Sequence, residues 1–209
     1  MRLVGVIKME RVSLVVDVYN FLLSSKQYLG QQCYVDCSKM HKYFIDPSTQ
    51  VWHKTYLYGG ASLGKLMNYF KSQPRVDVIL GETNVAGKEK CTDINLAIGM
   101  LTKAFYNTYD VALLFSGDKD YLKLVRELKR MGKIVGCVTP AGTPAKNARS
   151  LAVHCDFHIE LDESFYEAYW SEKQPPYVSC INNIEMNDDD ELVSDNLTDG
   201  NIDKLESCK

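Results

Sequence analysis

Short apolar segments alternate with segments whose apolar residues recur at helical spacing. The segment Val111–Phe115 is almost wholly apolar, as in a strand that is buried on both faces of a sheet. The segment after it predicts a helix whose core face is made of Tyr121, Leu124, Val125, Leu128 and Met131. Repeated with short connections, this alternation predicts an α/β domain with a central parallel sheet flanked by helices.

The same patterns divide most of the chain into predicted elements. Strands are predicted at 13–18, 51–58, 76–80, 111–115, 134–138 and 157–161, and helices at 20–29, 63–71, 92–106, 119–131 and 146–153. The apolar stripe of the helix at 92–106 consists of Ile94, Ala97, Ile98, Leu101, Ala104 and Phe105. Without a repeat or a second core, we predict one three-layer domain over residues 1–170, with a sheet of about five or six strands.

Charge is unevenly distributed along the chain, whose formal net charge is −3. Residues 185–209 hold nine acidic residues and two lysines, a net of −7, so residues 1–184 carry +4. Low hydrophobicity and dense negative charge predict a disordered tail at 171–209. The tail is either a solvated segment or one that competes with RNA for the basic part of the chain, residues 1–184. The net charge of that part is compatible with an RNA partner.

The composition argues against a membrane or secreted protein. No run of about 18 apolar residues is present, so no membrane-spanning helix is predicted. Lys8, Glu10 and Arg11 carry charge where a signal peptide needs its apolar stretch. Seven irregularly spaced cysteines are typical of reduced thiols inside a cell. We therefore predict a cytoplasmic protein without a membrane partner.

Cys33, Cys37 and His41 are spaced four residues apart, so a helix would place them on one face. Such a face could contribute to a zinc site, but no second ligand pair at a short spacing follows. Packing of this face against the sheet explains the same residues, and it is the interpretation that we favour.

Aspartates stand where several predicted segments reach the carboxyl-terminal edge of the sheet. Asp17 lies at the end of the first strand, Asp118 and Asp120 follow the strand that ends at Phe115, and Asp93 opens a helix. Ligand sites of open parallel sheets lie beyond this edge. Crowded carboxylates repel one another unless a cation neutralises them, and oxygen ligands suit Mg²⁺ or Mn²⁺. Two such ions can activate water and stabilise the leaving oxygen in phosphodiester hydrolysis.

Other interpretations of these aspartates were weighed. Asp93 and Asp118 could simply cap the helices that start beside them, which for either residue alone is as good an explanation as metal binding. A P-loop is absent, which argues against that type of nucleotide site. A phosphatase of the haloacid dehalogenase class needs a second aspartate two residues after the first, and Tyr19 stands there.

Four blocks, LVVDVYN, GKEKCTDINLAI, YDVALLFSGDKDYLKLVRELKRMGKIVGCV and SLAVHCDFHIEL, follow in this order over about residues 13–161. They resemble the blocks of NYN domains, which belong to the PIN-like nuclease superfamily. The Ser-Gly-Asp-x-Asp-aromatic motif of the third block is the most specific part. The resemblance implies a PIN-like fold, dependence on Mg²⁺ or Mn²⁺, and RNA as the usual substrate.

By position, the resemblance assigns catalysis and metal binding to the same four residues, Asp17, Asp93, Asp118 and Asp120. The residues predicted to support these acids or to contact RNA are Asn20, Ser116, Lys88, Lys90 and Lys119. For the three lysines, a solvated loop is an equally good explanation. Tyr121 could stack on a base, although its place in the core stripe is the simpler account.

The chain departs from the family pattern at Gly99, where many members carry a further aspartate. A missing carboxylate would leave a one-metal or slow enzyme, or a member that binds RNA without cutting it. We predict a metal-dependent ribonuclease, with a non-catalytic RNA-binding module as the alternative. A homodimer is left open.

Overall fold

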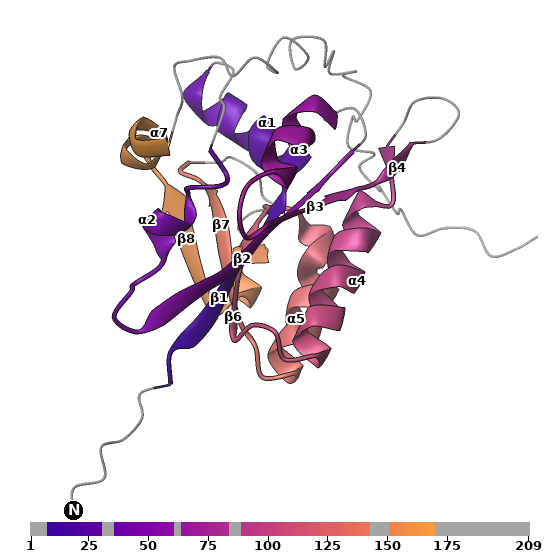
Figure 1. Cartoon of the computed structure of the whole chain (residues 1–209), viewed down its shortest axis with the longest axis vertical. Helices are drawn as coiled ribbons and strands as arrows, with labels where there is room; N and C mark the ends of the chain where they lie inside the picture. Colours follow the sequence, from indigo (N-terminus) through magenta and orange to yellow (C-terminus); the bar gives the residue numbers. More distant parts are fainter. Residues whose placement is uncertain (1–7, 31–35, 61–63, 84–88, 143–150, 170–209) are drawn as a thin grey trace, which may run out of the picture.

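The computed structural model describes residues 8–30, 36–60, 64–83, 89–142 and 151–169. Its centre is a parallel sheet with the strand order β3-β2-β1-β6-β7-β8 (Figure 1). The strands of this sheet are β1 Glu10–Asp17, β2 Gln50–Gly59, β3 Val76–Leu80, β6 Val111–Phe115, β7 Ile134–Pro140 and β8 Phe157–Leu161. A short antiparallel pair, not predicted, is formed by β4 Glu82–Thr83 and β5 Glu89–Lys90.

Helices cover both faces of the sheet, which confirms the predicted three-layer α/β arrangement. They are α1 Val18–Leu29, α2 His41–Phe44, α3 Gly64–Lys71, α4 Thr92–Phe105, α5 Leu122–Arg130 and α7 Glu163–Tyr169. A single 3₁₀ turn over Lys119–Tyr121 precedes α5, where one continuous helix was predicted. Of the helix predicted at 146–153, residues 151–153 are helical and the others lie outside the described residues.

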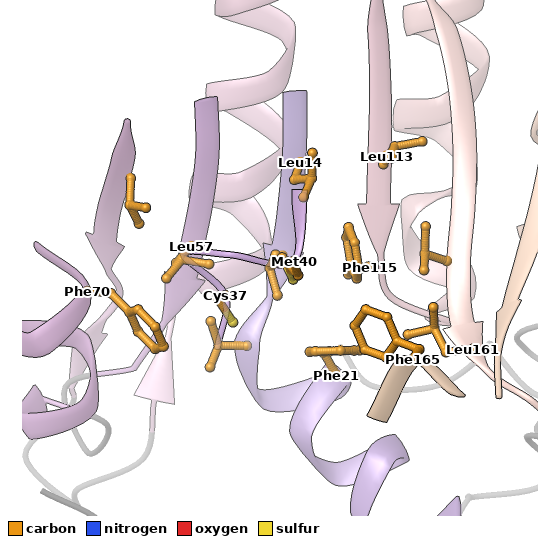
Figure 2. Packing of buried hydrophobic residues seen from close by; sticks show 14 of the residues in the cluster. Leu14, Phe21, Cys37, Met40, Leu57, Phe70, Leu113, Phe115, Leu161 and Phe165 are labelled. Atoms are coloured by element: carbon orange, nitrogen blue, oxygen red, sulfur yellow. The ribbon is translucent and has the colours of Figure 1, made fainter. Parts of the chain in front are cut away.

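The alternation of side chains along β1 divides the core into two halves. Leu14 and Val16 point to the face covered by α1, α3 and α7, where Phe21 and Phe165 also pack (Figure 2). Val15 points to the opposite face, which α4 and α5 cover. Side chains two residues apart on a strand point to the same face of the sheet. Asp17, at the end of β1, therefore lies on the same side as Val15, which is the side of α4 and α5.

The order of the strands creates a topological switch point at the centre of the sheet. The chain moves outward from β1 to β3 in one direction, and from β6 to β8 in the other. Connections that leave β1 and β6 therefore diverge, and this switch point is where open α/β sheets bind ligands. At the opposite edge of the sheet, Arg11 clamps these two strands, because its guanidinium donates to both carboxylate oxygens of Asp110 at 2.9 and 3.0 Å.

The predicted core stripe of α4 was wrong in part. Ile94 and Ile98 are each 58% exposed and Phe105 is 75% exposed, whereas Leu96 and Met100 are buried. Two apolar stripes with helical spacing run along α4, and spacing alone does not say which of them faces the sheet. The structure packs the other stripe on the sheet, so an apolar row remains on the outer surface of α4.

The helix that would place Cys37 and His41 on one face does not form. Residues 37–40 form turns and α2 begins at His41. Cys37 is buried in the core, and the ring of His41 stacks on Trp52 with 3.6 Å between the ring centroids. Cys33 lies outside the described residues. Packing, the favoured interpretation, accounts for the two residues that are described.

None of the helices among the described residues has the length and apolar character needed to cross a membrane. The helix α7, which was not predicted, packs on the sheet through Phe165 and Tyr166 and ends at Tyr169. The predicted boundary at residue 170 and the predicted disorder of 171–209 fall outside the described residues and stay predictions.

Candidate active site

Asp17 lies at the switch point between β1 and β6 and is 5% exposed. Its carboxylate caps α1, since Oδ1 accepts a hydrogen bond of 3.1 Å from the backbone N–H of Asn20. A carboxylate at the start of a helix is favoured by the helix dipole and by the unpaired N–H groups. One oxygen of Asp17 is thus used by the helix, and the other faces α4 and α5.

Tyr121 connects Asp17 to Asp93 through its hydroxyl group. The hydroxyl oxygen lies 3.1 Å from Oδ2 of Asp17 and 2.8 Å from Oδ1 of Asp93. A phenol carries one proton, so it can donate to only one of the two carboxylates at a time. Asp17, which is buried, is therefore one donor or one positive charge short of being satisfied whenever that proton points to Asp93, which is exposed to water.

The shortage of positive charge is visible in the acidity of the carboxyl groups. The pKa of Asp17 is raised from 3.8 to about 6, mainly by burial and with a smaller contribution from repulsion by Asp93 and Asp118. The pKa of Asp118 is also raised, mainly by burial and then by the nearby Asp120 and Asp93. The two carboxylates from β1 and from the loop after β6 therefore share one electrostatic environment.

The loop after β6 is held in place from two sides. The side-chain oxygen of Asn20 accepts a 3.1 Å hydrogen bond from the backbone N–H of Gly117, which ties α1 to this loop at the switch point. The hydroxyl of Ser116 accepts from the N–H of Asp118 at 3.2 Å. Asp118 in turn caps the 3₁₀ turn, because its Oδ1 accepts from the N–H of Asp120 at 2.9 Å. Capping and a position at the rim are thus combined in one residue.

The other predicted residues take more peripheral places. Asp93 lies in the first turn of α4 and is exposed, but the residue before that helix is Cys91, so the alternative that Asp93 caps α4 is wrong. Asp120 and Lys119 are exposed at the rim. Lys88 lies outside the described residues, as does the side chain of Lys90, and their predicted contacts with RNA stay predictions.

The donor set fits a divalent cation in its chemistry. Within the described part of the chain, no three acidic, histidine or cysteine groups stand close enough together to hold one ion as the side chains are placed. The closest arrangement is the Asp17–Tyr121–Asp93 chain, in which the tyrosine hydroxyl occupies the position between the carboxylates. Buried, mutually repelling oxygen ligands without nitrogen or sulphur suit Mg²⁺ or Mn²⁺.

Gly99 faces Tyr58 of β2. A Cβ atom at this position would overlap the hydroxyl oxygen of Tyr58, whose side chain is fully buried. The aromatic side chain on β2 therefore fills the space that a residue larger than glycine would need. The absence of a carboxylate at position 99 is linked to the presence of Tyr58, and neither residue was connected to the other by the sequence patterns.

Comparisons with known proteins agree with this fold. The family model described as NYN domain matches residues 11–162. A protein of unknown function from Vibrio parahaemolyticus has a similar fold, with a TM-score of 0.59, 16% identity, and coverage of 78% of this chain and 97% of that chain. A nicotinamidase from Staphylococcus aureus, at a TM-score of 0.39 and 15% identity over 70% of this chain and 94% of its own, supports no inference. A comparison with curated protein sequences gave no significant match.

Asp17→Asn is expected to stabilise the metal-free protein at neutral pH. Because burial raises the folded-state pKa of Asp17 from 3.8 to about 6, the contribution of this one group to the stability is fully present below pH 4 and is lost as the pH rises through 6. Asparagine keeps the capping oxygen but carries no charge. At pH 7.5 the variant should gain up to roughly 3 kcal/mol in free energy of unfolding, and near pH 4 the difference should vanish.

Urea unfolding in EDTA at several pH values measures this difference. Asp120→Asn, which removes an exposed carboxylate from the same rim, is the matched control and should show little change. A variant that is less stable than the wild type at pH 7.5 would contradict the electrostatic account of Asp17.

Gly99→Ala is expected to destabilise the protein by about 1–3 kcal/mol, because the added methyl group meets the buried Tyr58 hydroxyl. In a Tyr58→Phe background the cost should fall by at least about 1 kcal/mol, since the overlapping oxygen is gone. Thermal or urea unfolding of the four proteins of this cycle gives the coupling. Equal costs in the two backgrounds would mean that Tyr58 does not restrict position 99.

Proposed function

We propose that this chain, which belongs to the NYN family of the PIN-like nuclease superfamily, is a metal-dependent ribonuclease that hydrolyses RNA phosphodiester bonds. The observation that carries the proposal is the buried Asp17 carboxylate at the switch point of the sheet, with Asp93 and Asp118 close enough to raise its pKa. A structural aspartate at such a place would be expected to have a basic partner, whereas Asp17 has an amide N–H and one shared phenol proton.

Asp17 and Asp118 are the residues that we assign as principal ligands of Mg²⁺ or Mn²⁺, with Asp93 and Asp120 completing the set. The bound cation would supply positive charge to the phosphodiester and make water more acidic at neutral pH. For this chain, the consequence is that two carboxylates from separate strands can both stay ionised. Without the ion, burial and the neighbouring carboxylates disfavour the ionised forms, and the pKa of Asp17 and of Asp118 is raised.

The residues around the aspartates hold the carboxylates in position. Asn20 holds the backbone of Gly117 and so fixes the position of the loop bearing Asp118 relative to Asp17. Ser116 fixes the N–H of Asp118, and the ring of Tyr121 closes the core beneath the carboxylates while its hydroxyl reaches them. Lys119, exposed beside Asp118, is placed to attract a phosphate group of the substrate.

RNA is the substrate that family membership supports best. The body of the chain carries +4 over residues 1–184, so the long-range attraction that nucleic acids require is available despite the net charge of −3. Lys88 and Lys90 belong to the same proposal as phosphate contacts, and cytoplasmic action on RNA stays part of the proposal.

One observation favours a second function, an RNA-binding module that does not cut. Tyr58 occupies the space beside Gly99, so this helix position cannot carry the further aspartate that many family members have there. With fewer carboxylates, a second cation would be held weakly. This candidate predicts RNA binding without any metal-dependent cleavage.

Labelled single-stranded RNA incubated with the protein in Mn²⁺, in Mg²⁺ and in EDTA tests the proposal. Cleavage should require the metal and should fall by about 10²-fold or more in Asp118→Asn, because that variant removes a principal ligand. Glu167→Gln, which removes an exposed carboxylate from α7 on the other face of the sheet, is the matched control and should cleave like the wild type.

Equal cleavage by wild type and Asp118→Asn would overturn the assigned site. If the wild type binds RNA but does not cut it in either metal, the proposal of a ribonuclease is overturned and the RNA-binding module is established.

A further inference from the structure

The outer face of α4 carries an exposed apolar stripe. Ile94 and Ile98 are each 58% exposed, Phe105 is 75% exposed, and the half-buried Leu101 lies between them. These four residues, which we call the α4 stripe, follow one another at intervals of four, three and four residues. That spacing places them on one side of the helix and is typical of a helix that packs along another helix.

A groove of about 490 Å³ runs between α4 and α5 beside this stripe. Its apolar lining consists of Ile94, Ala97, Leu101 and Leu124, so the stripe and the groove form one continuous surface. Figure 1 shows the two helices next to each other, and both cover the same face of the sheet. An apolar surface of this kind gains free energy when a second surface covers it and removes it from water.

Charges of alternating sign border this surface on the side of α5. Asp120, Lys123 and Glu127 line the groove, and Arg130 follows one turn later; all four are exposed. Lys123 has no carboxylate within ion-pair distance among the described residues. Arg130 lies 3.5 Å from Glu127, and such a pair on an exposed helix surface contributes little. We call these four residues the α5 charge row, and its charges are available to another molecule.

The α4 stripe is symmetric about its own centre. The point midway between residues 99 and 100 is equally far along the helix from Ile98 and Leu101, and equally far from Ile94 and Phe105. If two copies of α4 pack antiparallel about a two-fold axis through that point, each residue of the stripe meets an apolar residue of the other copy. The stripe is therefore complementary to itself.

The α5 charge row is symmetric in the same sense, with its signs reversed. Residue 125 lies midway between Lys123 and Glu127, and also midway between Asp120 and Arg130. About a two-fold axis at this level, Lys123 faces the Glu127 of a second copy and Asp120 faces its Arg130. Every charge of the row then meets the opposite charge, whereas a uniformly acidic or basic partner would be repelled by two of the four.

One axis can serve both helices, because their centres lie at nearly the same level. Both helices begin at the carboxyl-terminal edge of the sheet, and the hydroxyl of Tyr121 bonds to Asp93 at 2.8 Å near their first turns. At a rise of about 1.5 Å per residue, the two centres lie within about one helical turn of each other. A two-fold axis perpendicular to both helices packs each of them antiparallel on its own copy, as in a four-helix bundle.

We infer that the chain forms a symmetric homodimer through the α4 stripe and the α5 charge row. The self-complementary charges are the reason for choosing a second copy as the occupant of this surface. The inference goes beyond the proposed function and does not rest on it. Asp17 and Asp118 do not line the groove, so the dimer leaves these two residues uncovered and brings the Arg130 of the second copy beside Asp120.

Ile98→Asp tests the apolar part of the interface, because it places a carboxylate close to the axis. Ile98 is already 58% exposed, so the fold should persist, which circular dichroism checks. Sedimentation velocity of the full chain in EDTA should show the mass of two chains for the wild type. The dissociation constant should rise about 100-fold or more in the variant. Val153→Asp, the same change at a position that is 79% exposed and outside this surface, is the matched control and should stay dimeric.

A wild type that stays monomeric over the whole concentration series would overturn the inference and would leave the surface to a different partner. A dimer that survives Ile98→Asp, or one that Val153→Asp dissociates equally well, would also overturn it. Because the measurement uses neither metal nor RNA, its result is independent of the proposed ribonuclease activity.

An exchange of charges tests the antiparallel register. Lys123→Glu should weaken the dimer by roughly tenfold, because the new carboxylate faces the Glu127 of the second copy. Lys123→Glu/Glu127→Lys restores opposite charges across the axis and should recover most of the wild-type affinity. Arg126→Glu, the same change of charge on α5 at a residue that does not line the groove, should have little effect. Failure of the exchanged variant to recover, or an equal loss in Arg126→Glu, would overturn the pairing.

Discussion

Burial of one carboxylate at the end of the central strand governs the arrangement of this site. Asp17 is placed on the side of α4 and α5 by the parity of β1, at the point where connections from β1 and β6 diverge. Its negative charge is stabilised by the N-terminus of α1 and by the hydroxyl proton of Tyr121, which it shares with Asp93. The loop of Asp118, the first turn of α4 and the start of α5 all converge on this charge. Burial, with a smaller contribution from Asp93 and Asp118, raises the pKa of Asp17 to about 6.

Much of this arrangement could be predicted from residue patterns. Asp17 ends one strand and Asp118 follows another, both strands are apolar enough to be identified from their composition, and parallel strands bring their carboxyl ends to one edge. The order of those strands could not be predicted, because spacing along the chain does not show which strand is central. The switch point, which makes Asp17 and Asp118 neighbours, is a property of that order.

One prediction was confirmed but incomplete, and another was wrong, for the same physical reason. Tyr121 belongs to the core stripe of its helix, yet its hydroxyl extends past the core to Asp17 and Asp93, so a residue placed by its ring acts through its oxygen. The outer stripe of α4, with Ile94 and Ile98, was taken for the core because two stripes share helical spacing. In both cases the periodicity identifies a face but not what that face meets.

The central claim is that the charge missing at Asp17 is supplied by a divalent cation. Crystals soaked in Mn²⁺ and measured for anomalous scattering locate that ion directly. The account predicts a peak within about 2.5 Å of carboxylate oxygens of both Asp17 and Asp118, with the Tyr121 hydroxyl no longer between Asp17 and Asp93. A saturated crystal with no manganese at this edge of the sheet, or with manganese only elsewhere, would contradict it.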